Sequence, residues 1–210
     1  MTIDTLLDQY PQLAECRPVI DQAAGMLVAA YVDGHKVLTC GNGGSAADAE
    51  HIVGELMKGF LSKRPLSAEA RQALVEAGGD DGAYMAENLQ TPLPAVSLVS
   101  SVSLATAFAN DVAPELTFAQ QVYGLGQPGD VLIALSTSGN SRNVVLAVLA
   151  ARVRGMRTIG MTGGSGGRLK ELCDVTINVP AQATPVIQEL HLPVYHYLCA
   201  AVEARMFGAT

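Results

Sequence analysis

Tryptophan is absent from the chain, and aromatic residues make up only 5% of its 210 residues. Charged side chains are also few, at 16%, and 20 acidic against 13 basic residues give a formal net charge of -7. A negative chain repels phosphate backbones unless its basic residues cluster, and the densest group contains only Lys58, Lys63 and Arg64. We therefore expect no nucleic-acid partner.

Long apolar runs are missing as well. The longest one near the start, residues 26–32, is too short to span a bilayer, and residues 1–10 lack the basic residues of a secretory signal. No CxxC motif occurs, and the cysteines lie in apolar surroundings, as free thiols in a reducing compartment do. They are Cys16, Cys40, Cys173 and Cys199. These absences predict a cytoplasmic protein without a membrane partner.

Glycine and apolar residues are abundant, with 21 glycines and 49% hydrophobic residues, as in compact α/β proteins. Strand-like segments occur at 36–40, 95–99, 130–135, 158–161 and 175–179, and helical patterns at 4–31, 45–60, 103–110, 115–123, 143–154, 168–173 and 188–207. Their alternation predicts an α/β fold with a doubly wound, mostly parallel five-stranded sheet flanked by helices.

The predicted organisation is a single domain over residues 1–210. It begins with an N-terminal helical segment, residues 1–33, which Pro11 interrupts. Residues 61–94 are expected to form an irregular insertion, with a short helix at 67–76 and a glycine-rich turn at 78–82.

Two loops rich in small residues follow predicted strands, where open α/β sheets bind ligands. The segment Ser136-Thr-Ser-Gly-Asn-Ser141 precedes a helix, whose unpaired N–H groups and neighbouring hydroxyls suit a phosphate. Capping of that helix is the alternative interpretation of the same residues. The loop Cys40-Gly-Asn-Gly-Gly-Ser45 repeats the pattern but lacks the P-loop lysine and the GxGxxG spacing, which argues against a nucleotide site.

Three of the four histidines fall on two predicted helices. His51 and Glu55 are four residues apart and share a helix face, although such pairs are also common on plain surfaces. Gln188 and His196 lie two turns apart and about 80° around the terminal helix, whereas His191 points elsewhere. Histidine with a carboxylate can act as acid and base or bind zinc, and the spacing does not separate these roles.

Four segments, in order along nearly the whole chain, resemble the phosphoheptose isomerases, a family of SIS (sugar isomerase) domains. They are residues 40–51, Phe108-Ala-Asn-Asp111, residues 136–141 and residues 187–196. The resemblance implies an SIS domain and an aldose–ketose isomerase that converts sedoheptulose 7-phosphate to D-glycero-D-manno-heptose 7-phosphate by enediolate proton transfer. It also implies a homotetramer with sites shared between subunits.

The same resemblance implies roles for individual residues. Glu55 and His196 match the catalytic acid–base pair, and one zinc ion per subunit would be held by His51, Glu55, Gln188 and His196. Substrate contacts would come from Asn42, Gly43, Gly44, Glu55, Asn110, Asp111, Ser136, Thr137, Ser138, Ser141 and Gln188. Glu55 cannot be both a firmly held ligand and a free base, and the sequence leaves this choice open.

Two features keep other functions open. Lys58 stands where members of the family often carry an arginine, and residues 61–94 are longer than usual, so another ketose phosphate is an alternative substrate. A tetrameric, non-catalytic SIS adaptor that binds the replication initiator is a second alternative. Such adaptors tend to lose the helix carboxylate and the C-terminal histidine, whereas this chain keeps Glu55 and His196.

Overall fold

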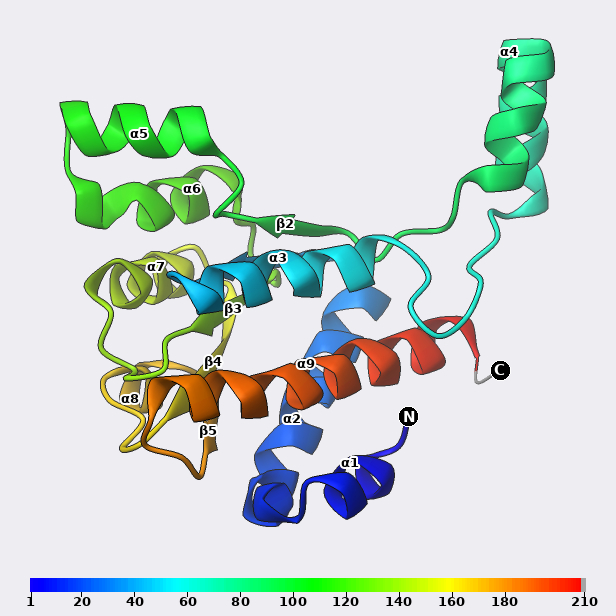
Figure 1. Cartoon of the computed structure of the whole chain (residues 1–210). Coiled ribbons are helices and arrows are strands. Elements are labelled where there is room, and N and C mark those ends of the chain that lie inside the picture. The colour runs from blue at the N-terminus through cyan, green and yellow to red at the C-terminus, as the bar shows by residue number, and fades with distance from the viewer. Residues whose placement is uncertain (209–210) are drawn as a thin grey trace.

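A five-stranded parallel sheet forms the centre of the computed structural model, which describes residues 1–208 (Figure 1). Its strands are β1 (Val37–Cys40), β2 (Ala95–Ser97), β3 (Val131–Leu135), β4 (Arg157–Gly163) and β5 (Val175–Val179). Their order is β2-β1-β3-β4-β5, and every neighbouring pair is parallel. The predicted doubly wound α/β class is confirmed.

Helices cover both faces of this sheet. α2 (Arg17–Val32), α3 (Gly44–Met57) and α9 (Thr184–Phe207) share one hydrophobic core with Val131 and Ile133 of β3. α6 (Thr117–Leu125), α7 (Arg142–Val153) and α8 (Leu169–Leu172) share the other core with Leu132 and Ala134. The alternation along β3 follows from the two-residue period of a strand and explains why this strand is apolar throughout.

The N-terminal segment and α9 differ slightly from the predicted helices. α1 (Ile3–Gln9) is followed by the 3-10 helix η1 (Pro11–Cys16) before α2 begins, so the interruption at Pro11 lies where the sequence predicts it. α9 begins four residues earlier than predicted, with a proline in its first turn, where a missing N–H costs nothing. Within residues 1–208, none of the helices is both long and apolar enough to cross a membrane.

The prediction that residues 61–94 form an irregular insertion is wrong in its extent, because most of them form α4 (Ala68–Asn88). The short helix predicted at 67–76 is present as the first part of α4. α4 consists of two helical arms that meet at Gly79, whose φ of +55° reverses the chain inside the predicted turn. An antiparallel bridge between Pro65 and Gln90 closes the base of this hairpin. Figure 1 shows α4 projecting away from the sheet.

The remaining helices, α5 (Val102–Asp111) and the short 3-10 helix η2 (Pro114–Leu116), connect β2 to α6. No residue of α5 is buried, and it lies beside α6 at the end of the molecule opposite α4 (Figure 1). Both predicted helices between β2 and β3 are therefore present.

Candidate active site

A pocket of about 340 Å³ lies at the carboxyl ends of β1 and β3. The chain leaves these adjacent strands toward opposite edges of the sheet, which makes their junction the switch point where α/β sheets bind ligands. The lining residues are Asn42, Gly43, Gly44, Ser45, Leu135, Ser136, Thr137, Ser141, Thr184 and Gln188. The structure thus brings together seven residues that the resemblance implied as substrate contacts.

The loop between β3 and α7 forms one wall of the pocket. Ser136 donates its hydroxyl proton to Ser141 Oγ at 3.0 Å and accepts the Ser141 N–H at 3.3 Å, which closes the loop. Gly139 has a φ of +67° and lies against the backbone of Gly166, where a Cβ would collide. The start of α7 adds the positive end of a helix, so the wall suits a phosphate.

The opposite wall is formed where α3 and α9 begin. The side-chain amide of Gln188 lies so close to Gly44 that a Cβ on residue 44 would overlap it. Asn42 and Asn143 exchange two amide hydrogen bonds of 2.9 Å and tie this wall to α7. Sequence reasoning missed Asn143 and the lining residue Thr184. Asn143 lies at the start of a predicted helix, whereas Thr184 precedes the predicted helix 188–207 and gave no signal.

Farther along the same two helices, three side chains that the resemblance implied as functional meet. His51 Nε2 lies 3.2 Å from Glu55 Oε1 and 3.5 Å from His196 Nε2. The other Glu55 oxygen lies 2.9 Å from the Lys58 ammonium, and the Glu55 side chain is only 13% exposed. Burial, and after it the neighbouring His51, lowers the pKa of His196, which favours a neutral imidazole.

Behind this group lies a tyrosine that sequence reasoning missed. The hydroxyl of buried Tyr195 lies 3.0 Å from His51 Nδ1 and 3.3 Å from Asp48 Oδ1. Burial raises the pKa of the Asp48 carboxyl and of the Tyr195 phenol. Only its place beside His196 on a helix could have drawn attention to Tyr195.

The implied zinc ligands are brought only partly together. Among residues 1–208, no group of three or more His, Cys, Asp and Glu side chains has the arrangement of a metal site. His51 touches both Glu55 and His196, but no ion pair joins Glu55 to His196 in this part of the chain. Gln188 holds its amide against Gly44, two turns away along α9.

Three further predicted contacts lie outside the pocket. Asn110 donates to Asp111 at 2.8 Å on the exposed α5, and neither residue lines the pocket. The Ser138 hydroxyl is exposed and accepts the Asn140 N–H at 3.2 Å. As expected, His191 points elsewhere: it is buried and lies 3.1 Å from the Thr162 carbonyl.

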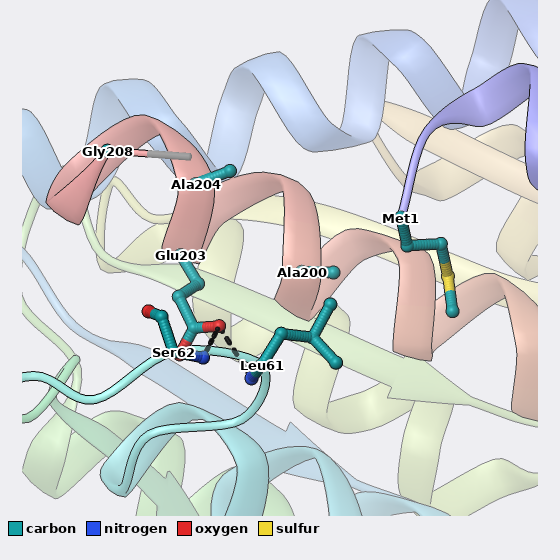
Figure 2. A pocket seen from close by; sticks show the side chains of 7 residues that line it. All are labelled: Met1, Leu61, Ser62, Ala200, Glu203, Ala204 and Gly208. Carbon is teal, nitrogen blue, oxygen red and sulfur yellow. Dashed lines mark hydrogen bonds between the residues drawn. The ribbon is translucent and has the colours of Figure 1, made fainter. Parts of the chain in front are cut away.

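A second cavity, of about 270 Å³, lies beside the end of α9. Figure 2 shows its lining: Met1, Leu61, Ser62, Ala200, Glu203, Ala204 and Gly208. The Glu203 carboxylate accepts three backbone N–H groups and the Arg64 guanidinium. Burial would raise the pKa of Glu203, but the amide hydrogen bonds and Arg64 outweigh it and lower this pKa. The carboxylate in this lining is already hydrogen-bonded, and the lining has no loop of several hydroxyl groups like the one that suits a phosphate in the first pocket.

The parallel sheet, the serine-rich loop at its switch point and the two paired helices define an SIS domain. A sequence model of the SIS domain family matches residues 5–74 and 85–163, which is more than half of the chain. The gap between the two matched segments, residues 75–84, contains the reversal of α4 at Gly79.

Comparison with individual proteins identifies a family within the SIS domains. The chain is 43% identical to the phosphoheptose isomerase of Rhodospirillum rubrum, over 95% of this chain and 92% of that protein. It is 44% identical to the one from Thiobacillus denitrificans, over 91% and 85%. The structure of a phosphoheptose isomerase from Neisseria gonorrhoeae matches with a TM-score of 0.74 and 33% identity, covering 96% of both chains. The chain therefore belongs to the phosphoheptose isomerase family, and the prediction of a sugar-phosphate isomerase is confirmed.

Proposed function

We propose that the protein converts sedoheptulose 7-phosphate to D-glycero-D-manno-heptose 7-phosphate. The pocket at the ends of β1 and β3 would bind the phosphate, and the group of His51, Glu55 and His196 would act at the carbonyl end of the sugar. Glu55 would be the base, and His196 would serve the oxygens.

The spacing of these two places along α3 and α9 is the observation that supports a long substrate. Gly44 and Gln188 meet at the pocket, whereas His51 and His196 meet farther along, so the two helices run side by side in the same direction. Seven residues separate Gly44 from His51, which is about 10 Å along a helix. A sugar whose phosphate lies at the far end from its carbonyl, in an extended form, fits this separation better than a short ketose phosphate.

The proposed proton transfers use two side chains. Glu55 removes a proton from C1, and the electrons of that bond form the C1–C2 double bond of the enediolate while O2 gains a proton from His196. His196 then takes the proton from O1, and Glu55 returns its proton to C2, which leaves an aldehyde at C1. A lowered pKa keeps His196 neutral, so its imidazole can donate and accept in turn.

A zinc ion is part of the proposal. His51 lies 3.2 Å and 3.5 Å from its two neighbours, close to the spacing of about 3.3 Å between ligands of a tetrahedral zinc ion. The resemblance adds Glu55, His196 and Gln188 to His51 as ligands, and Gln188 would have to turn its amide away from Gly44 to join them. When bound, zinc would polarise the carbonyl and stabilise the enediolate.

We extend the proposal to a homotetramer. Asn110 and Asp111 lie on α5, away from the pocket of their own chain, and α5 exposes Val102 and Leu104. Packing of α5 against a neighbouring copy would cover these side chains and could bring both polar residues to that copy's site. The cytoplasmic location stays a prediction.

An isomerase assay tests this function. Purified protein should turn over sedoheptulose 7-phosphate faster than shorter ketose phosphates, and chelation should abolish turnover, which added zinc should restore. Turnover that is indifferent to chelator would remove the metal from the proposal. Faster turnover of a shorter ketose phosphate would change the substrate, and no turnover of any would favour the adaptor.

The Glu55→Gln variant separates the two roles of this residue. Loss of a catalytic base should lower kcat by about 10²- to 10⁴-fold. If zinc affinity is unchanged, Glu55 is the base, whereas loss of zinc affinity would make it a ligand. Glu50→Gln is the matched control, because Glu50 lies on the same helix but contacts the Ser100 hydroxyl at 2.9 Å. Near-normal turnover of Glu55→Gln would contradict the base role.

A further inference from the structure

Asp48, Tyr195 and His51 form a hydrogen-bonded chain behind the proposed reaction site. Tyr195 is 1% exposed, and its hydroxyl lies between Asp48 Oδ1 at 3.3 Å and His51 Nδ1 at 3.0 Å. The other Asp48 oxygen, Oδ2, is buried and has no hydrogen-bond partner within residues 1–208. The Tyr195 ring also packs edge-on against the rings of His51 and His196, which holds the hydroxyl in place.

The position of the Tyr195 hydroxyl proton decides which groups donate and which accept in this hydrogen-bonded chain. A tyrosine hydroxyl has a single hydrogen, and Tyr195 is the one donor to Asp48 within residues 1–208. An ionised Asp48 carboxylate only accepts and therefore depends on this donor. If the hydroxyl instead donated to His51, Asp48 Oδ1 would lose this donor while the buried Oδ2 already lacks one within residues 1–208, which is costly. The hydrogen therefore lies toward Asp48, and the phenolic oxygen accepts the Nδ1–H of His51.

We propose that Asp48 and Tyr195 are positioning residues that hold His51 as its Nδ1–H tautomer. A neutral imidazole carries one proton, so Nε2 keeps a free lone pair. That lone pair faces the electron-rich Glu55 Oε1 at 3.2 Å and His196 Nε2 at 3.5 Å. Without a cation between them, Glu55 favours the opposite Nε2–H tautomer, and Tyr195 has to hold the ring against it. The value of this tautomer for a metal rests on the function proposed above, but its selection by Tyr195 does not.

Nitrogen NMR of the histidine rings tests the tautomer directly in metal-free protein. The chain has only four histidines, so the His51 signals can be assigned by substituting the others. Wild-type His51 should carry its proton on Nδ1, and Tyr195→Phe, which keeps the ring, should shift the proton toward Nε2. Zinc titration calorimetry should then show about 10- to 100-fold weaker binding to Tyr195→Phe, the usual effect of losing a residue that orients a ligand.

Tyr197→Phe is a closely matched control. Tyr197 is buried on the same helix, and its hydroxyl donates to Asp21 Oδ1 at 3.4 Å, away from His51. This variant should leave the His51 tautomer and the zinc affinity unchanged. Asp48→Asn should act like Tyr195→Phe, because a neutral amide competes less strongly for the tyrosine proton.

The outcomes separate this inference from the proposed function. An Nε2–H tautomer of His51 in the wild-type protein would overturn the inference, as would an Nδ1–H tautomer that persists in Tyr195→Phe. If wild-type protein binds no zinc but shows the tautomer change, the positioning role stands and the metal part of the proposed function fails.

Discussion

The interface between α3 and α9 has two ends that are built differently. At its glycine end, Gly44 and Gln188 meet, and the fit depends on the absence of a side chain and on the path of the backbone. At its histidine end, His51, Glu55 and His196 meet through side chains whose directions depend on packing from behind.

The support of the histidine end joins residues that are far from one another in the sequence. Arg64 donates to Glu203 at 2.7 Å and to the carbonyls of Leu56 and Glu55 at 2.6 and 3.2 Å. The N–H of Phe60 donates to the same Glu203 at 2.8 Å, and the Phe60 ring lies 5.4 Å from the His196 ring. One buried ion pair therefore ties the end of α3, next to Glu55, to the end of α9. Backbone geometry fixes the glycine end without such a device.

Removing the Glu203 charge should have the largest effect. Both ion-pair partners are buried, so Glu203→Gln leaves Arg64 without its counter-charge and should cost about 3–5 kcal/mol of unfolding free energy. Chemical denaturation measures this loss. At a temperature where the variant is folded, kcat should also fall, because Glu55 and Phe60 lose their anchor.

Asp130→Asn is the control for that variant. Asp130 is equally buried and accepts hydrogen bonds from the Lys36 ammonium and two backbone N–H groups. It precedes β3, however, and so lies at the amino ends of the strands, away from the pocket at their carboxyl ends. Asp130→Asn should also lower stability, although by less, because the Lys36 side chain is 27% exposed, and it should leave kcat unchanged. Equal losses of kcat in both variants would show that Glu203 acts through stability alone.

Acid should weaken the packing of α9 against β4, where His191, between the two ends along α9, contacts the Thr162 carbonyl. Burial lowers the pKa of His191 from 6.5 to about 4. The unfolded chain therefore binds more protons between these values, and stability falls as the pH drops through this range, by about 3 kcal/mol in total. Denaturation at several pH values measures the slope, and His191→Gln should flatten it. An unchanged slope in the variant would assign the acid sensitivity to other groups.

The same contrast explains what the sequence could and could not predict. The strands, the serine loop and the glycine end follow from short-range patterns, because small residues after a strand leave few backbone paths. Glu203 and Tyr195 gave no such signal, since their partners lie 139 to 147 residues away along the chain. In α4, the first arm and the turn lie where the sequence predicts them, but the second arm, residues 80–88, has no pattern beyond the glycines of the turn that predicts a helix.

A methyl group at Gly139 should disturb the phosphate wall at the glycine end. Gly139→Ala places a Cβ against the Gly166 backbone and forces a φ of +67° on a side-chain-bearing residue, which should cost about 2 kcal/mol. Gly25→Ala on α2 is the control, because no atom lies within 4 Å of its added Cβ. Thermal unfolding should show a loss for the first variant and none for the second. Equal midpoints for both would mean that the loop shifts freely, contrary to a wall fixed by its backbone.

The smallest effect is expected from single hydroxyls in that wall. Ser136 lines the pocket and Ser138 does not, although the family resemblance implied both as contacts. A hydrogen bond to a charged group contributes about 1.5 kcal/mol, so Ser136→Ala should lower kcat/KM about tenfold, mainly through KM. Ser138→Ala should change it little if the loop keeps its shape when the phosphate binds. A comparable loss in Ser138→Ala would mean that the exposed hydroxyl turns inward with the substrate, and that the glycine end, like the histidine end, owes part of its fit to side-chain movement.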